Sequence, residues 1–200
     1  MIYLIRHAVT EWNEKQLWQG VVDTDLSKKG IEQARKIGDF FKMNDIKIDI
    51  IYSSPMKRAI QTAQEIALKI GYDAENILVD ERLRECEIVL WNGKNIKDVL
   101  KFHYKEFTEW QNNLDSKIDN VESLKSVQKR MYGFLEEKKI QFQDKNVIIV
   151  SHAIALRMLI SKVLNVFPPH HLNFSLDNAS ISGLEVTQNK IRLKFLNIVL

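Results

Sequence analysis

Short runs of apolar and β-branched residues alternate along the chain with longer segments whose apolar positions recur every three or four residues. The short runs are typical of buried strands, and the longer segments are typical of helices with one apolar face. Strands are predicted over residues 2–5, 48–52 and 146–150, and helices over residues 30–43, 56–70, 121–142 and 154–164. This alternation indicates an α/β fold.

The strand segments are apolar on both faces. In Val147-Ile148-Ile149-Val150 four apolar residues follow one another, which is typical of a parallel strand covered by helices on both sides. Residues 181–186 and 191–199 instead predict a hairpin across Gln188-Asn189 that closes one edge of the sheet. We therefore expect a three-layer α/β/α sandwich around a mainly parallel, mixed sheet.

Residues 87–120 do not follow this alternation. Their aromatic side chains lie among charged residues at partly helical spacing, which favours helices that pack around these rings. The aromatic residues are Trp91, Phe102, Tyr104, Phe107 and Trp110. We expect a small helical excursion above the sheet edge, within a single domain over residues 1–200, because a chain of 200 residues is short for two domains.

Charge and composition argue against several classes of protein. The 29 Lys and Arg residues against 26 Asp and Glu residues give a net charge of +3, and these charges are dispersed, which disfavours a nucleic-acid or membrane-surface binder. No apolar run approaches the ~20 residues that a membrane-spanning helix needs. The single cysteine, Cys86, cannot form an internal disulfide, so we expect a cytoplasmic, reducing location. A homodimer is compatible with this composition.

Polar clusters follow four strand ends. They are Arg6-His7 after the first strand, Ser53-Ser54-Pro55 with Arg58 after the second, Glu85 after Leu78-Val79, and Ser151-His152 after Val150. Sites in open α/β sheets form beyond the carboxyl ends of the strands. Each cluster alone is more often structural than functional, but four clusters that converge on one edge predict a site there.

Two arginines, two histidines and one carboxyl group suit phosphoryl transfer. The guanidinium groups of Arg6 and Arg58 match phosphate oxygens and stay charged at physiological pH. A neutral histidine is a nucleophile toward phosphorus when its other ring nitrogen is protonated and held by an acceptor. On this argument either His7 or His152 could be the nucleophile.

The sequence resembles the histidine phosphatase superfamily, the phosphoglycerate mutase-like fold, in order over nearly the whole chain. The matching segments are Arg6-His7-Ala8-Val9-Thr10, Glu11-Trp12-Asn13, Gln19-Gly20, Asp25-Leu26-Ser27 with Gly30, Ser53-Ser54-Pro55 with Arg58-Ala59 and Thr62-Ala63, Leu83-Arg84-Glu85, Glu122-Ser123-Leu124 and Val150-Ser151-His152. Ala8 and Ala153 depart from the family, which more often has glycine after each histidine. These two methyl groups change the shape of the pocket and leave the reacting groups intact.

The resemblance implies a role for each polar cluster. His7 would be the phosphorylated nucleophile and Glu85 the proton donor. The phosphate pocket would consist of Arg6, Arg58 and a protonated His152, and the residues expected to contact the substrate are Asn13, Thr10 and Ala153. The resemblance thus implies a metal-independent phosphatase without a cofactor, which hydrolyses a small phosphorylated metabolite through a phosphohistidine and has the excursion over its active site.

One pair of histidines lies outside these clusters. His170 and His171 follow two prolines and could suggest a metal site. Adjacent loop residues point in different directions, however, and no Cys or Asp/Glu cluster is near them in the sequence, so we expect a structural turn.

Two alternative functions stay open. The first is a phosphoglycerate mutase, but cofactor-dependent mutases of the family extend the segment after the donor glutamate with an Arg-Tyr-Gly stretch, which residues 86–90 lack. The second is a non-catalytic phospho-ligand binding module, which the complete set of catalytic residue types disfavours. A turnover assay would separate a phosphatase from such a module.

The substrate is the least determined feature. The segment Asp177-Asn178-Ala179-Ser180, the opening Arg6-His7-Ala8 with Glu11-Trp12-Asn13 and the length of the chain look most like metal-independent phosphoserine phosphatases. The α-ribazole phosphatases and broad sugar-phosphate phosphatases of the superfamily share much of this pattern, and phosphoserine is the leading candidate. Its carboxylate would need a cation beyond the phosphate pocket, and the candidates are Arg84, Lys94 and His103.

Overall fold

The computed structural model describes residues 1–187 and 190–200, which form one six-stranded sheet with helices around it. The strands are β1 (Ile2–Arg6), β2 (Ile50–Ser53), β3 (Leu78–Val79), β4 (Val147–Ser151), β5 (Ile181–Val186) and β6 (Ile191–Ile198). They follow the order β3-β2-β4-β1-β5-β6. The first four are parallel, whereas β5 pairs antiparallel with β1 and β6 antiparallel with β5. The mixed, mainly parallel sheet is confirmed, and the hairpin turn predicted at Gln188-Asn189 lies outside the described residues.

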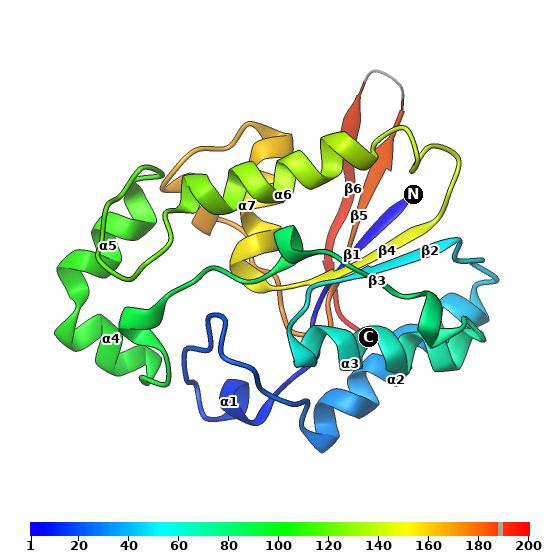
Figure 1. Cartoon of the computed structure of the whole chain (residues 1–200), viewed down its shortest axis with the longest axis horizontal. Helices are drawn as coiled ribbons and strands as arrows, with labels where there is room; N and C mark the ends of the chain where they lie inside the picture. Colours follow the sequence, from blue (N-terminus) through cyan, green and yellow to red (C-terminus); the bar gives the residue numbers. More distant parts are fainter. Residues whose placement is uncertain (188–189) are drawn as a thin grey trace.

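Helices cover both faces of the sheet, because successive strand residues point to opposite sides. The covering helices are α2 (Lys28–Met43), α3 (Lys57–Ile70), α6 (Leu124–Lys138) and α7 (Ala153–Leu164). Tyr3 and Ile5 of β1 pack in one core with α2 and α3, and Ile2 and Leu4 pack in a second core with α6 and α7. Figure 1 shows the two helical layers on either side of the strands. The three-layer α/β/α sandwich is therefore confirmed.

Two helices, α4 (Ile96–Phe102) and α5 (Tyr104–Asn112), form the excursion predicted between residues 87 and 120. Figure 1 shows them together at one end of the molecule, apart from the helices that cover the sheet. The excursion has its own aromatic core, in which the ring of Trp91 lies 5.4 Å, centroid to centroid, from those of Phe107 and Trp110.

Phe102 and Tyr104 do not join this aromatic core, so the prediction that they pack within the excursion is wrong. They are 67% and 63% exposed. The chain leaves the helical conformation at His103, between α4 and α5. Because Phe102 and Tyr104 flank this break, the helical spacing does not continue across it, and both rings face solvent.

Two helix boundaries depend on capping side chains. Helix α6 is shorter than the predicted helix over 121–142 because it begins after Ser123, whose hydroxyl caps its first turn. The short helix α1 (Glu11–Glu14), which the hydrophobic pattern does not predict, begins with a capping box between Thr10 and Asn13. No helix within residues 1–187 or 190–200 is long and apolar enough to cross a membrane.

Candidate active site

The register of the parallel strands brings the two histidines together. Arg6 on β1 pairs with Ser151 on β4, so the next residues, His7 and His152, leave the sheet side by side with ring centroids 5.2 Å apart. A cavity of about 310 Å³ opens at His7, and its wall consists of Arg6, His7, Asn13, Leu17, Trp18, Gln19, Gly20, Arg58, Glu85, Ile88, Ile96, Ala153, Ile154 and Arg157. Since Ile88 and Ile96 belong to the excursion, the excursion borders the cavity.

His7 has the tautomer that a nucleophile needs. Its Nδ1 lies 2.8 Å from the carbonyl oxygen of Ala8, and because a carbonyl oxygen only accepts, Nδ1 carries the proton. Nε2 is then the unprotonated nitrogen that can attack phosphorus. Burial, followed by the charges of Arg58 and Arg6, holds the pKa of His7 well below its usual value. His7 is therefore neutral at physiological pH.

Backbone carbonyls fix both arginines of the expected phosphate pocket. Arg6 Nη1 donates to Leu176 O at 2.7 Å, and Arg58 donates through Nη1 to Val22 O and through Nη2 to Gly20 O, each at 2.7 Å. Burial lowers the pKa of both guanidinium groups to about 10, so both stay charged at physiological pH. Two fixed cations beside a neutral histidine form a pocket that suits a phosphate dianion.

His152 is fully buried beside His7. Its Nε2 lies 2.7 Å from Ser54 Oγ, and its Nδ1 has no partner among the described residues. In the protein without substrate, burial and then the charge of Arg58 hold the pKa of His152 well below its usual value. A bound phosphate dianion favours the protonated form, so the protonated His152 expected during phosphoryl transfer stays a prediction.

Glu85 lies on the cavity wall with its carboxylate at the amino end of α7. Its Oε1 accepts hydrogen bonds from Cys86 N at 2.8 Å and Ala155 N at 3.1 Å, and its Oε2 accepts one from Ile154 N at 3.2 Å. These three bonds fix the carboxylate in the cavity that holds His7. Glu85 is thus placed for proton transfer to or from a substrate bound there.

The three residues expected to contact the substrate have different positions. Asn13 and Ala153 line the cavity. Asn13 Oδ1 accepts from the backbone N and the hydroxyl of Thr10 and from Asn178 Nδ2, which leaves its own Nδ2 as a donor for a ligand. Thr10 is buried behind Asn13 and caps α1, so it orients Asn13 and is not part of the cavity wall.

This geometry is accompanied by a match to a known family. The sequence pattern described as the histidine phosphatase superfamily (branch 1) matches residues 2–199. The chain belongs to the histidine phosphatase superfamily. It is a phosphatase for small phosphorylated substrates, which confirms the reaction that the resemblance implied.

Members of the superfamily with different names resemble this chain over most of their length. Phosphoserine phosphatase 1 from Hydrogenobacter thermophilus is 33% identical over 200 residues, which cover 98% of this chain and 92% of that protein. A relative from Escherichia coli O1:K1 / APEC bears the name of a phosphoglycerate mutase, GpmB. It is 31% identical over 193 residues, which cover 94% of this chain and 86% of that protein. The structure of phosphoserine phosphatase from Entamoeba histolytica in complex with 3-phosphoglyceric acid is 28% identical, with a TM-score of 0.84 over 99% of this chain and 96% of that chain.

Arg130, a partly buried arginine that sequence reasoning missed, holds the loop that carries Glu85. Arg130 on α6 donates through Nη1 to the carbonyl oxygens of Arg82 at 2.8 Å and Arg84 at 2.6 Å, and through Nη2 to Glu85 O at 3.0 Å. Glu122 pairs with Arg130 at 3.0 Å. The sequence gives little signal for this role because Arg130 and Glu85 are 45 residues apart.

Arg157 is a second residue that sequence reasoning missed, and it lines the cavity from α7. It lies four residues after Ala153, so both side chains are on one face of the helix. The helix predicted over residues 154–164 therefore contained the signal that would have placed Arg157 next to the site.

The cations that the sequence suggested for a substrate carboxylate do not line the cavity. Arg84 pairs with Glu122 at 3.1 Å. Lys94 Nζ lies 2.9 Å from His103 Nε2, in a separate hollow beside α4. None of the three suggested residues, Arg84, Lys94 and His103, is part of the wall of the cavity that holds His7.

Metal-ligating side chains do not gather in any part of the chain that the structure describes: it holds no group of three or more His, Cys, Asp or Glu suited to a metal ion. His170 and His171 lie in a short 3₁₀ turn, in which His171 is buried. The structural turn expected there is confirmed.

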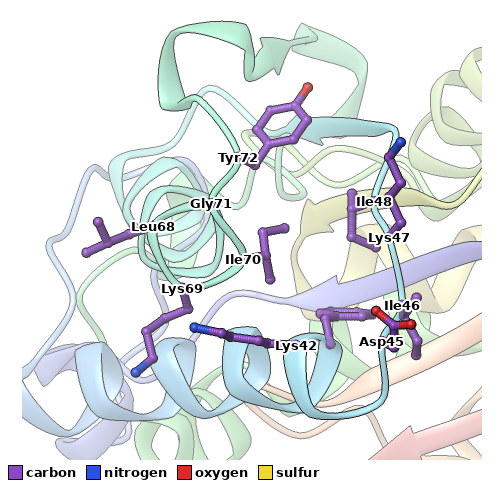
Figure 2. A pocket seen from close by; sticks show the side chains of 11 residues that line it. Lys42, Asp45, Ile46, Lys47, Ile48, Leu68, Lys69, Ile70, Gly71 and Tyr72 are labelled. Carbon is purple, nitrogen blue, oxygen red and sulfur yellow. The ribbon is translucent and has the colours of Figure 1, made fainter.

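A second hollow, of about 590 Å³, shares no lining residue with the cavity at His7, and Figure 2 shows the side chains that border it. It is bordered by the carboxyl-terminal ends of α2 and α3 and by Lys47 and Ile48, which precede β2. The catalytic candidates follow the carboxyl ends of the parallel strands, whereas this hollow adjoins an amino end. It is therefore separate from the active site.

Proposed function

We propose that this protein hydrolyses a small phosphomonoester that carries a carboxylate, with phosphoserine as the first candidate, through a phosphohistidine on His7. The observation that carries the proposal is that neutral His7, with Nε2 free, shares one cavity with Arg6, Arg58 and Glu85. This arrangement supplies a nucleophile, two fixed cations and a proton donor without further groups.

In the first step, His7 Nε2 attacks phosphorus in line with the ester oxygen. The phosphorus–oxygen bond breaks, and protonated Glu85 gives its proton to the departing alkoxide. Arg6 and Arg58 stabilise the charge on the equatorial oxygens.

In the second step, the Glu85 carboxylate draws a proton from a water molecule while that water attacks phosphorus. The phosphorus–nitrogen bond breaks, inorganic phosphate leaves, and His7 returns to the neutral form. Glu85 is protonated again and ready for the next substrate, so one carboxyl group serves both steps.

Phosphoserine is the first candidate because relatives that are similar over nearly their whole length bear the name phosphoserine phosphatase. A phosphoglycerate mutase is the second candidate, supported by the relative named GpmB. A binding module without turnover is a third, and the complete set of reacting groups in the cavity argues against it. The homodimer and the cytoplasmic location stay predictions.

A substrate panel tests this proposal. We expect the specificity constants for phosphoserine and 3-phosphoglycerate to exceed those for α-ribazole phosphate and fructose bisphosphate by about tenfold or more, or ~1.4 kcal/mol of transition-state preference. Phosphate release and formation of 2-phosphoglycerate are measured in the same reactions, with and without a chelator. A preference for substrates without a carboxylate would contradict the substrate class, and 2-phosphoglycerate as the main product would indicate a mutase.

A further inference from the structure

Three guanidinium groups line the active-site cavity, and they differ in what they contact. Arg6 and Arg58 donate to backbone carbonyls beside His7. Arg157 lines the same cavity, but within residues 1–187 and 190–200 it makes no hydrogen bond and no ion pair, and its Nε is shielded from solvent without an acceptor. Arg157 is thus a cation in the active site that lacks a partner.

No acidic side chain among the described residues forms an ion pair with Arg157. Glu85 is the carboxylate whose charge acts on Arg157, and the three hydrogen bonds that its oxygens accept all come from backbone N–H groups. The other charged or titratable groups that act on Arg157 or respond to it are Arg6 and His171. Burial lowers the pKa of His171 to about 4, with the charge of Arg157 as the second cause. His171 is therefore neutral and adds no charge beside Arg157.

A partly buried charge without a partner is unfavourable for the folded protein. Such a group is expected where a ligand supplies the missing charge. Arg157 lies four residues, or about 6 Å along the helix, beyond Ala153 at the amino end of α7. A ligand whose phosphate lies at His7 would need a second anionic group only a few bonds away in order to reach Arg157.

We infer that Arg157 binds the carboxylate of the substrate, and thereby selects phosphomonoesters that carry a carboxylate a few bonds from the phosphate. This inference rests on the proposed function. Arg157 takes the role that the sequence suggested for Arg84, Lys94 or His103, and its planar fork of donors suits a bidentate contact with a carboxylate. The apolar wall formed by Ile88, Ile96 and Ile154 would strengthen this contact by keeping water away from it.

The test compares two substrates that differ only in the carboxylate, phosphoserine and phosphoethanolamine, in the parent protein and in Arg157→Met. We expect the specificity constant for phosphoserine to fall roughly 10- to 100-fold, mainly through KM, as is typical when a charge-assisted contact is lost. The constant for phosphoethanolamine and the inhibition constant of inorganic phosphate should change less than about threefold, because the phosphate pocket stays intact. Lys162→Met, which removes an exposed lysine from the same helix, is the matched control and should change neither substrate.

The outcomes separate this inference from the proposed function. An equal loss of the specificity constant for both substrates would show that Arg157 acts on the phosphate or on the structure. An unchanged specificity constant for phosphoserine would show that Arg157 does not contact the carboxylate. Either result overturns the inference while phosphatase activity stands. Arg157→Lys, which keeps the charge and loses the fork, should retain part of the preference for phosphoserine, and it replaces the Met variant if that variant does not fold. A parent protein that hydrolyses neither substrate would overturn the proposed function and the inference with it.

Discussion

Replacing His7 with alanine is expected to lower kcat by a factor on the order of 10⁴ or more for every phosphomonoester, as is typical when the nucleophile of covalent catalysis is lost. In the parent protein the proton on Nδ1 is fixed by Ala8 O, so Nε2 presents its lone pair to the cavity. Among the described residues that line the cavity, His7 is the one histidine, and the neighbouring His152 is fully buried outside the cavity wall. Steady-state hydrolysis of an aryl phosphate measures the loss.

The control for this variant is His170→Ala, which removes an exposed histidine from the 3₁₀ turn after Pro169. It should keep the parent kcat. Thermal unfolding of both variants checks that they are folded. If His7→Ala kept more than about one hundredth of the parent kcat, the nucleophile would be a different group.

Glu85→Gln is the second substitution with a large expected effect. It keeps the size of the side chain and removes the proton that the leaving group needs. For an alkyl phosphate such as phosphoserine, we expect kcat/KM, which reports the phosphoryl transfer to His7, to fall on the order of 10²- to 10⁴-fold, the range of lost general acid catalysis. For an aryl phosphate the loss of kcat/KM should be smaller, because a phenolate leaves without a proton. The ratio of the two losses in kcat/KM is the measured quantity.

Glu87→Gln is a suitable control for Glu85→Gln, because Glu87 is an exposed acid two residues further along the same loop. It should leave the kcat for both substrates unchanged. Equal losses for alkyl and aryl phosphates in Glu85→Gln would mean that Glu85 acts through its charge and transfers no proton to the leaving group.

The sequence predicts the parts of the site that follow strand ends. Arg6, His7 and His152 come directly after β1 and β4, and the parallel register then forces them together. The alternation of apolar runs and helical spacing is enough to predict this edge of the sheet. The family resemblance adds the separate roles, which residue types alone leave open between the two histidines.

The remaining features depend on contacts that a linear pattern does not contain. Arg130 acts on the backbone of a loop 45 residues earlier, and Arg157 lacks a partner because the Glu85 carboxylate is bonded to the backbone at the amino end of α7 and not to Arg157. The lowered pKa of His152 results from its complete burial and from the nearby charge of Arg58. Neither is visible in the sequence before the packing is known. The helical spacing likewise predicts Phe102 in the aromatic core of the excursion, because it does not show the break at His103 that leaves Phe102 exposed.

The central claim, a phosphoryl group held on His7, is tested most directly by trapping the enzyme during turnover with a radiolabelled substrate. Rapid denaturation in base should leave label on the parent protein that is stable in base and lost in acid, as a phosphoramidate is, and mass spectrometry of the base-stable peptide should place it on His7. His7→Ala should carry no label, and Glu85→Gln should accumulate it from an aryl phosphate, because Glu85 is needed to activate water in the second step. Label found on a serine, on Cys86 or on His152 would contradict the account.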